Sequence, residues 1–513
     1  MPDNNISSNK RIAKNTFFLY GRMIVVLLVS LYTTRIVLSV LGVSDYGILN
    51  VVGGFVSMFA FLNSAMTNTT QRFYNFEKST TSIEGRRETY NTALQIQGLL
   101  AVVILLLLES FGLWYINNKM IIPVERLAAA NYVFQFSTMS LVVLVLQIPY
   151  SASIIAHERM DYYAVVSIID VILKLIIVLI LPHISYDKLI FYGMTAFVMS
   201  IVNFFLYYIY AKRNFDEIRF VPVFVGKKFR QILSFTSWNV FGSFAYMIQG
   251  QGLNVLMNAF FGPIVNAARG VAYQIQTAIN GFSENIATAF RPQLVGSYAK
   301  EDYDRTRILM FSMSKYCFIM LCTLSIPIFL ELPYILKIWL KGVVPEHTVV
   351  FTYIVLANML LGSLNMPISQ TVQATGKVKY YQIIRSVLVT STLPIAWVVL
   401  EFGAPPVSVF IVMLIISILN QPLSMAILHR LFNYSYKAYL RQVIVPCSIF
   451  GIIGTIPPLL FVIFFAESFS RFCIVVMSSV ISSLLVAYFI ILSKNEKTLV
   501  TGAFVNFIKR IKK

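Results

Sequence analysis

Long apolar segments follow one another along almost the whole chain, separated by short polar connections. Each has about 20 residues, the length that a helix needs to cross a bilayer. Fourteen can be placed: 16–41, 46–66, 91–115, 127–149, 162–182, 188–210, 230–257, 263–289, 308–331, 347–368, 381–401, 406–429, 442–465 and 469–492. The pattern predicts an all-α membrane protein with about 14 transmembrane helices.

Two of these segments, 230–257 and 263–289, carry polar residues along one helical face and meet at Gly262-Pro263. Their polar positions recur at spacings of three and four. On the first they are Asn239, Ser243, Tyr246, Gly250 and Asn254, and on the second Asn266, Arg269, Tyr273, Gln276, Asn280 and Glu284. Lipid cannot hydrogen-bond such groups. Amides also hold membrane helices together, but two adjacent stripes, one with an arginine, favour a hydrated central cavity.

Composition and charge agree with a polytopic membrane protein. Of the 513 residues, 58% are hydrophobic and only 12% are charged, while the net charge is +19. Most basic residues of the predicted connections lie on the side that holds the N-terminus, as expected for cytoplasmic loops. The charge is therefore explained by topology without nucleic acid, and both termini are predicted to be cytoplasmic.

The longest inside connection divides the chain. We expect an N-terminal six-helix lobe over 1–210, an inter-lobe loop over 211–229 and a C-terminal six-helix lobe over 230–440, followed by a helix pair over 441–492 and a basic tail over 493–513. A faint repeat supports this division, because LGVSDYGILNVV at 41–52 aligns with FGPIVNAARGVA at 261–272. Repeats of this kind are typical of alternating-access transporters.

Six basic residues fall inside predicted helices: Arg22, Arg35, Lys174, Arg269, Lys315 and Arg385. Lys315 and Arg385 lie near the cytoplasmic ends, where long side chains reach the interface. Arg269 has no acid three or four residues away, although an arginine at such depth costs about 2.5–3.5 kcal/mol. A fixed cation of this kind suits an anion, and phosphate matches the guanidinium fork.

Embedded acids are scarcer. Asp170 lies four residues before Lys174, so a helix-internal ion pair is one interpretation and a proton relay is the other. Glu284 is the second candidate for ion coupling, and protons and sodium are both left open. Because the predicted cavity is cationic, a cationic drug fits it poorly as cargo.

The sequence contains no phosphate-binding GxxxxGK[ST] loop, no HExxH motif and no Cys/His cluster with metal-ligand spacing. The four cysteines lie in apolar segments and are interpreted as small buried hydrophobes. These observations predict a transporter rather than an enzyme, with no cofactor, no resident metal and no nucleic-acid partner.

Three stretches resemble polysaccharide export proteins: KNTFFLYGRMIVVLLVSLYTTRIVLSVLGVSDYGILNVV, QIPYSASIIAHERMDYYAVVSIIDVILKL and QATGKVKYYQIIRS. The whole chain is similar to the Wzx-type O-antigen flippases, in the superfamily that includes multidrug extruders and the lipid II flippase. The resemblance implies two six-helix lobes in a V, plus a C-terminal pair with a groove for a polyprenyl tail. It also implies the bacterial cytoplasmic (inner) membrane, and the export of undecaprenyl-diphosphate-linked oligosaccharides such as O-antigen, lipopolysaccharide or capsule units, beside membrane lipid and glycan polymerases.

The resemblance also suggests roles for individual residues. In the lipid II relatives, arginines of the first helix and of the second lobe hold the diphosphate, so Arg22 and Arg269 are the matching candidates and Arg35 is a third. We expect sugar hydroxyls to bind the polar side chains of the two stripes, namely Asn239, Gln249, Asn254, Tyr273, Gln276 and Asn280. A cation-coupled multidrug or metabolite antiporter and a non-transporting scaffold are the alternatives.

Overall fold

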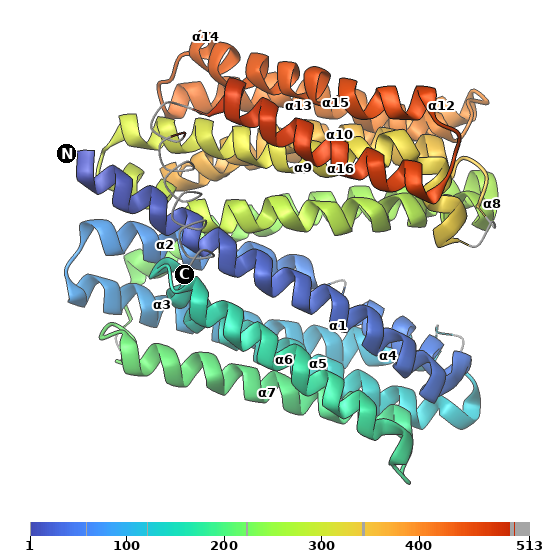
Figure 1. Ribbon diagram of the computed structural model, residues 1–513. Coiled ribbons are helices and arrows are strands. Elements are labelled where there is room, and N and C mark those ends of the chain that lie inside the picture. The colour runs from blue at the N-terminus through green and yellow to red at the C-terminus, as the bar shows by residue number, and fades with distance from the viewer. Residues whose placement is uncertain are drawn as a thin grey trace, which may run out of the picture. The chain divides into compact units, whose positions relative to one another are not determined.

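The computed structural model describes residues 2–57, 59–118, 120, 122–221, 224–340, 344–492 and 497. Within the helices some side chains also lie outside the described residues, among them Arg35, Gly262, Pro263 and Asn266. The described elements are all helical, and no strand occurs among them (Figure 1).

Ten helical spans in the described part of the chain are long and apolar enough to cross a bilayer. They are Ile83–Asn118, Val124–Ala156, Met160–His183, Lys188–Asn214, Tyr303–Trp339, Thr348–Thr375, Lys379–Glu401, Val407–Leu431, Tyr436–Phe464 and Phe469–Ile491. Each corresponds to one of the segments predicted from the sequence. The chain is therefore a multi-pass, all-α membrane protein. The other four predicted segments lie within helices α1, α2 and α8.

The chain packs as two compact units. Unit 1 comprises Met1–Ile248, Thr288–Thr306 and Gln373–Val387, and unit 2 comprises Gln249–Ala287, Arg307–Val372 and Leu388–Lys513. This division follows packing, and its boundaries differ from those of the lobes predicted from the sequence. The predicted lobes remain a hypothesis about transmembrane organisation.

Unit 1 is built around α5. Its helices are α1 (Pro2–Ser57), α2 (Ala60–Thr80), α3 (Ile83–Leu107), α4 (Leu113–Asn118), α5 (Leu127–Ala156), α6 (Met160–Ile180), α7 (Lys188–Asn214) and the start of α8 (Gly226–Ala299). Helix α5 packs against α1, α2, α3 and α7, and α1 also packs against α6 (Figure 1). The apolar core between them includes Val133, Phe134 and Val145, which are fully buried.

The N-terminal chain of unit 1 reverses direction between Asp45 and Lys78. Arg22 contacts Ser167 near the start of α6, which follows directly on the end of α5. Asp45 binds Arg126, which precedes α5, whereas Lys78 donates to Ala156 O at the end of α5. The chain therefore runs along α5 in one direction before Asp45 and returns after it. This arrangement agrees with the two antiparallel segments predicted at 16–41 and 46–66.

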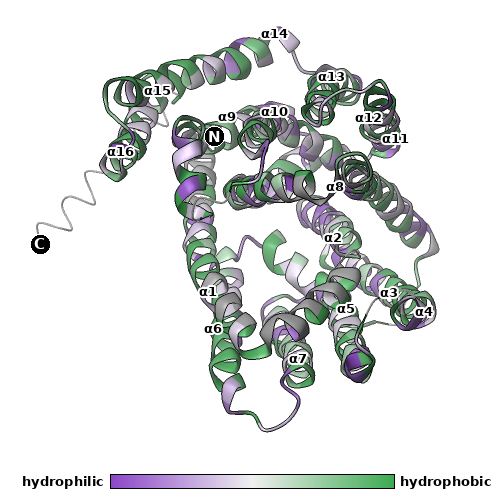
Figure 2. Ribbon diagram, turned by 90° about the vertical axis from the view of Figure 1, so that its right-hand side faces the viewer, coloured by the Kyte–Doolittle hydropathy of each residue, from purple (hydrophilic) through white to green (hydrophobic). Residues whose placement is uncertain are grey.

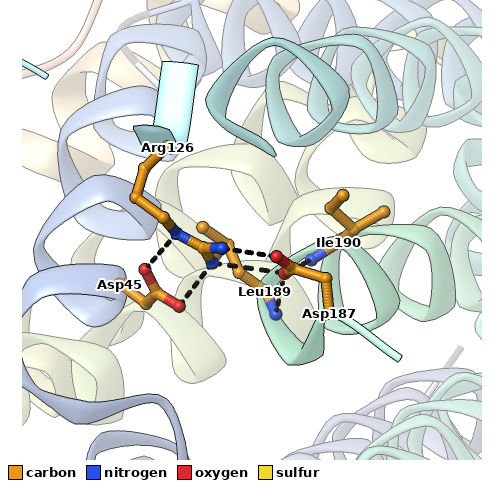
Figure 3. Close-up of polar contacts among 5 residues, drawn as sticks. All are labelled: Asp45, Arg126, Asp187, Leu189 and Ile190. Atoms are coloured by element: carbon orange, nitrogen blue, oxygen red, sulfur yellow. Dashed lines mark hydrogen bonds and ion pairs between the residues drawn. The ribbon is translucent and has the colours of Figure 1, made fainter. Parts of the chain in front are cut away.

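A cluster of charged side chains joins the same end of three helices in unit 1 (Figure 3). Arg126 Nε donates to Asp45 Oδ1 at 2.8 Å, and Arg126 Nη1 donates to Asp187 Oδ2 at 2.5 Å. Asp187 also caps α7, because its Oδ1 accepts from the backbone N–H groups of Leu189 and Ile190. One arginine thus ties α1 to the beginnings of α5 and α7.

Unit 2 contains the middle of α8 and the following helices: α9 (Tyr303–Trp339), α10 (Thr348–Thr375), α12 (Thr392–Glu401), α13 (Val407–Leu431), α14 (Tyr436–Tyr439), α15 (Val445–Phe464) and α16 (Phe469–Val486). Helix α11 (Lys379–Thr390) begins in unit 1 and ends in unit 2. Buried Leu253 and Ala268 of α8 pack against Phe351 of α10 and Phe410 of α13. Helices α15 and α16 pack together and are mainly apolar along their length, as lipid-facing helices are (Figure 2).

Helix α8 turns back on itself inside unit 2. Arg269 Nη2 donates to Gly250 O at 2.8 Å, although 19 residues separate them. A straight helix would place two such residues about 28 Å apart. The segment therefore reverses between Asn254 and Arg269, as expected for the two transmembrane segments that were predicted to meet at Gly262-Pro263.

Candidate functional site

Arg22 lies on α1 and faces α6 within unit 1. Its Nη1 donates to Ser167 Oγ at 3.4 Å, and its guanidinium carbon lies 5.0 Å from the centre of the Tyr163 ring. Its Nε is buried and has no hydrogen-bond partner among the described residues. Among the described residues, no carboxylate forms an ion pair with Arg22. Neutral groups hold the cation, and one of its donors is unused.

The polar face of α6 continues beyond this contact. Tyr163, Ser167, Asp170 and Lys174 follow one another at spacings of four, three and four, so they share one helical face. Lys174 Nζ lies 2.8 Å from Asp170 Oδ2, and Asn203 of α7 donates to Asp170 Oδ1 at 2.6 Å. Lys174 is about half exposed, whereas Asp170 is mostly buried. The i,i+4 pair expected from the sequence is present, with an amide that the sequence pattern did not indicate.

Arg269 occupies the second arm of the α8 hairpin in unit 2. Besides its bond to Gly250 O, its Nη1 donates to Asn254 Oδ1 at 3.1 Å. Its guanidinium carbon lies 4.6 Å from the centre of the Tyr273 ring, and the Tyr273 hydroxyl lies 3.6 Å from Met413 Sδ. Among the described residues, Arg269 also forms no ion pair. A cation next to an aromatic face is stabilised without loss of its charge.

The other side chains of unit 2 that were predicted to bind the cargo differ in whether they already form hydrogen bonds within the protein. Gln249 Nε2 donates to Thr392 Oγ1 at 2.9 Å. Gln276 and Asn280 are partly exposed, and neither has a hydrogen bond with another described residue. They follow Arg269 and Tyr273 on one face of α8, at spacings of four, three and four. Glu284 continues this face and is exposed.

Asn239 belongs to unit 1 instead. It is buried, its Nδ2 donates to Thr69 Oγ1 at 3.3 Å and to Phe235 O at 3.2 Å, and its Oδ1 accepts from Gln382 Nε2 at 2.8 Å. Its amide is therefore engaged in holding α2, α8 and α11 together. The side chain of Arg35 lies outside the described residues.

The sequence pattern did not single out the partners of Arg385. Its guanidinium carbon lies 4.9 Å from the centre of the Tyr246 ring and 5.5 Å from that of Tyr381, all within unit 1. The interpretation that it simply reaches the membrane interface leaves out these two rings. One of these partners could have been found from the sequence, because Tyr246 belongs to the polar stripe of segment 230–257.

Candidate metal ligands do not gather in the described part of the chain. No group of three or more His, Cys, Asp or Glu side chains is placed there to hold a metal ion. The four cysteines are free thiols, and three of them are buried. The chemistry available at the two arginines is therefore charge, hydrogen bonding and aromatic contact.

Solved structures with this arrangement of helices are known. A point mutant of a MATE protein has a TM-score of 0.72 and 12% identity, covering 83% of this chain and 97% of its own. An outward-facing multidrug resistance MATE family transporter has a TM-score of 0.71 and 14% identity, with the same coverage of both chains. The chain therefore shares the fold of these two solved structures, the second of which belongs to the MOP superfamily.

A third similar structure is a MOP superfamily transporter from Pyrococcus furiosus. Its TM-score is 0.70 at 13% identity, and the alignment covers 83% of this chain and 97% of that one. It is described as having a binding pocket of reversed polarity that suggests a different function. No family model and no curated protein matches the sequence. At these identities the likeness shows the fold of the chain, and its cargo has to be argued from its own residues.

Proposed function

We propose that this protein is an alternating-access flippase that moves an undecaprenyl-diphosphate-linked oligosaccharide from the cytoplasmic to the periplasmic leaflet of a bacterial inner membrane. The MOP transporter fold supports transport. The observation that carries the choice of cargo is that Arg22 and Arg269 are both held by neutral groups. A buried cation without a carboxylate keeps its charge available to an anionic ligand.

A phosphate group matches the guanidinium group of each arginine for a geometric reason. The guanidinium group presents parallel N–H donors that match two phosphate oxygens, and burial strengthens the attraction. In this proposal Arg22 with Ser167 provides a cationic position within unit 1, and Arg269 with Asn254 provides a separate one within unit 2. Arg35 remains a predicted third position. The MOP superfamily transporter whose binding pocket has reversed polarity supports the idea that proteins of this fold differ in function.

The glycan part of the cargo requires hydroxyl-binding groups beside the cations. Gln276 and Asn280 follow Arg269 on α8, and their amides have no partner in the described part of the chain, while Gln249 and Asn254 are each engaged by one neighbour. The rings of Tyr163 and Tyr273 provide flat apolar faces against which a sugar can pack. Asn239 is the weakest of the proposed glycan contacts, because three hydrogen bonds already occupy its amide.

The experiment replaces each arginine in cells that lack their own flippase and produce the lipid-linked glycan. We expect Arg22→Ala and Arg269→Ala to reduce surface polysaccharide at least tenfold at equal membrane abundance. Arg22→Lys and Arg269→Lys should retain part of the activity, because lysine keeps the positive charge but lacks the paired N–H donors of the guanidinium group. Arg213→Ala removes a cation from the exposed last turn of α7 and is the control. Undiminished polysaccharide in both alanine variants would exclude the diphosphate role.

A cation-coupled multidrug or metabolite antiporter is the second candidate. The specific observation in its favour is Asp170, an embedded carboxylate whose two oxygens are held by Lys174 and Asn203. In that function, Asp170→Asn or Glu284→Gln would abolish resistance to cationic dyes, and the arginine variants would leave resistance intact. Retained surface polysaccharide in the carboxylate variants, with unchanged dye resistance, would exclude this candidate. If both activities depend on Asp170, it and Lys174 serve ion coupling to flipping.

The proposed function also predicts which enzymes act beside this protein and which genes lie next to its own. A flippase for repeat units delivers its product to enzymes that extend the glycan, so we expect glycan polymerases as partners in the membrane. Genes for glycosyltransferases and a polymerase next to this gene would agree with the flippase, and a drug-responsive regulator would agree with the antiporter. A scaffold without transport activity would tolerate loss of both arginines.

A further inference from the structure

A cavity of about 610 Å³ lies within unit 1, and neither Arg22 nor Arg269 lines it. Its wall is formed by α2, by both ends of α8 and by the turn between α10 and α11. The residues that matter here are Arg72, Trp238, Gly376, Lys377 and Lys379. The volume falls in the usual range of small-molecule sites, which is about 300–1,000 Å³.

Arg72 is the most buried charged residue of this wall. It is 6% exposed, and its Nε and Nη2 donate to Gln373 O and Ala374 O, both at 3.3 Å. Its guanidinium carbon also lies within 5.4 Å of the ring centres of Phe73, Phe76 and Phe235. Burial lowers its pKa to about 10, so it remains charged at neutral pH. Nη1 has no hydrogen-bond partner among the described residues, and Arg72 forms no ion pair with them.

Two exposed lysines add to the positive charge. Lys377 and Lys379 line the cavity, and Lys379 Nζ lies 5.4 Å from the centre of the Trp238 ring. Glu301 is the only carboxylate in the described lining. A second cavity, lined by Lys227 and Arg230, shares Gln231 and Ser234 with the first, so the cationic surface extends along the start of α8.

The turn at Gly376 leads into the first turn of α11, which belongs to the same wall. Gly376 has a φ of +77°, and a Cβ there would lie 2.5 Å from Arg72 Nη2, so a residue without a side chain is required. Helix α11 starts directly afterwards at Lys379. The first N–H groups of a helix lack intrahelical acceptors and attract anions. Arg72 and the start of α11 are two independent features that favour an anion in one cavity.

We propose that this cavity binds a phosphate-bearing ligand. Arg72 and the start of α11 would receive the phosphate, Lys377 and Lys379 would neutralise its remaining charge, and the rings of Trp238 and Phe235 would contact the organic part. Two sources share this chemistry: a soluble phosphate or diphosphate, and the headgroup of an anionic phospholipid. The ligand would fasten α2 and α8 to the turn that begins α11, and its binding does not depend on the proposed transport of a lipid-linked glycan.

The experiment uses the purified full-length protein in nanodiscs. One arm titrates inorganic pyrophosphate into phosphatidylcholine nanodiscs and follows Trp238 fluorescence, with Trp238→Phe identifying the signal. The other arm compares the Tm in phosphatidylglycerol nanodiscs with that in phosphatidylcholine nanodiscs. The test variant is Lys377→Gln/Lys379→Gln, whose lysines are exposed and need not affect folding. The matched control is Lys212→Gln/Lys437→Gln, which removes the same charge from other exposed positions.

We expect the test variant to weaken pyrophosphate binding at least tenfold, or to lose the Tm increase given by phosphatidylglycerol, while the control variant keeps both. The first result assigns a soluble ligand and the second a lipid headgroup. Arg72→Lys should also reduce pyrophosphate binding or the Tm increase, because a lysine cannot replace the paired N–H donors of the guanidinium group. The proposal is overturned if neither probe gives a response, or if the test and control variants respond equally, which would indicate general attraction to a basic surface.

Discussion

Arg471 binds both carboxylate oxygens of Glu331 through hydrogen bonds of 2.8 and 2.7 Å. The Glu331 side chain has no exposed surface, and its backbone interrupts the helical geometry of α9 between Pro327 and Pro333. Proline removes a backbone donor from a helix and bends it. The two-point ion pair therefore fixes the bent end of α9 to the first turn of α16.

This pair leads to a stability prediction. Glu331→Ala leaves Arg471 largely buried without its carboxylate, and removal of one partner of a buried pair typically costs about 3–5 kcal/mol. Glu467→Ala is the control, because Glu467 meets Lys337 at 4.0 Å with both side chains well exposed. Such exposed pairs contribute about 0–1 kcal/mol. The measurement is the free energy of unfolding in detergent micelles, and equal losses in the two variants would contradict the structural account.

Two glycines of the α8 hairpin should respond in opposite ways to alanine. At Gly252 a Cβ would lie 2.8 Å from the Cδ atoms of Leu393, whereas at Gly250 it would meet nothing within 4 Å. Overpacking typically costs about 1–3 kcal/mol, while glycine to alanine inside a helix gains up to about 1 kcal/mol. Gly252→Ala should lower the Tm and Gly250→Ala should not. Leu393→Ala should restore part of the loss, and the absence of any rescue would count against this packing.

The amide of Asn239 allows its structural and ligand-binding roles to be separated. Asn239→Ala breaks three hydrogen bonds in a buried network, and unsatisfied buried groups cost about 1–3 kcal/mol each. We expect a lower Tm with little change in transport per folded molecule. Gln276→Ala removes an amide without a hydrogen bond to described residues, so transport should fall while the Tm stays the same. The reverse pattern would return Asn239 to the list of glycan contacts.

The stability of unit 1 should depend on pH through Asp187. Its hydrogen bond and ion pair with Arg126 hold the pKa of this carboxyl below its usual value of 3.8. A lowered pKa means that the stabilisation is complete above about pH 4 and is lost as the pH falls through the folded-state pKa. The wild type should therefore have a higher Tm than Asp187→Asn at pH 7, and this difference should shrink below pH 4. A difference independent of pH would contradict this account, because both the ion pair with Arg126 and the cap of α7 favour the charged carboxylate.

The sequence predicted those structural features that involve residues close together along the chain. The Asp170–Lys174 pair was predicted because the two residues are four positions apart on one helix. The reversal within α8 was predicted because two apolar segments meet at a glycine and a proline. The polar stripe also indicated that Arg269 needs a neutral or distant partner, and Gly250 and Asn254 belong to the neighbouring stripe. These features are determined by helical periodicity and the cost of burying polar groups.

Contacts between distant parts of the chain could not be predicted in this way. Nothing in the local sequence around Arg72 indicates its partners, because it binds carbonyl groups about 300 residues later. Asn239 belongs to the first stripe by spacing, but Thr69 and Gln382 take up its amide. Spacing shows which side chains share a face, and only packing shows which of them are left free to bind a ligand.

The bonds from Arg269 to Gly250 and Asn254 bear on how tightly a headgroup could be bound. A guanidinium group has five N–H donors, and these two acceptors leave at least some of them turned elsewhere. The long side chain is thus already fixed in one conformation by the hairpin. A ligand that arrives there has no flexible arm to immobilise, which removes an entropic penalty of about 0.5–1.5 kcal/mol from its association.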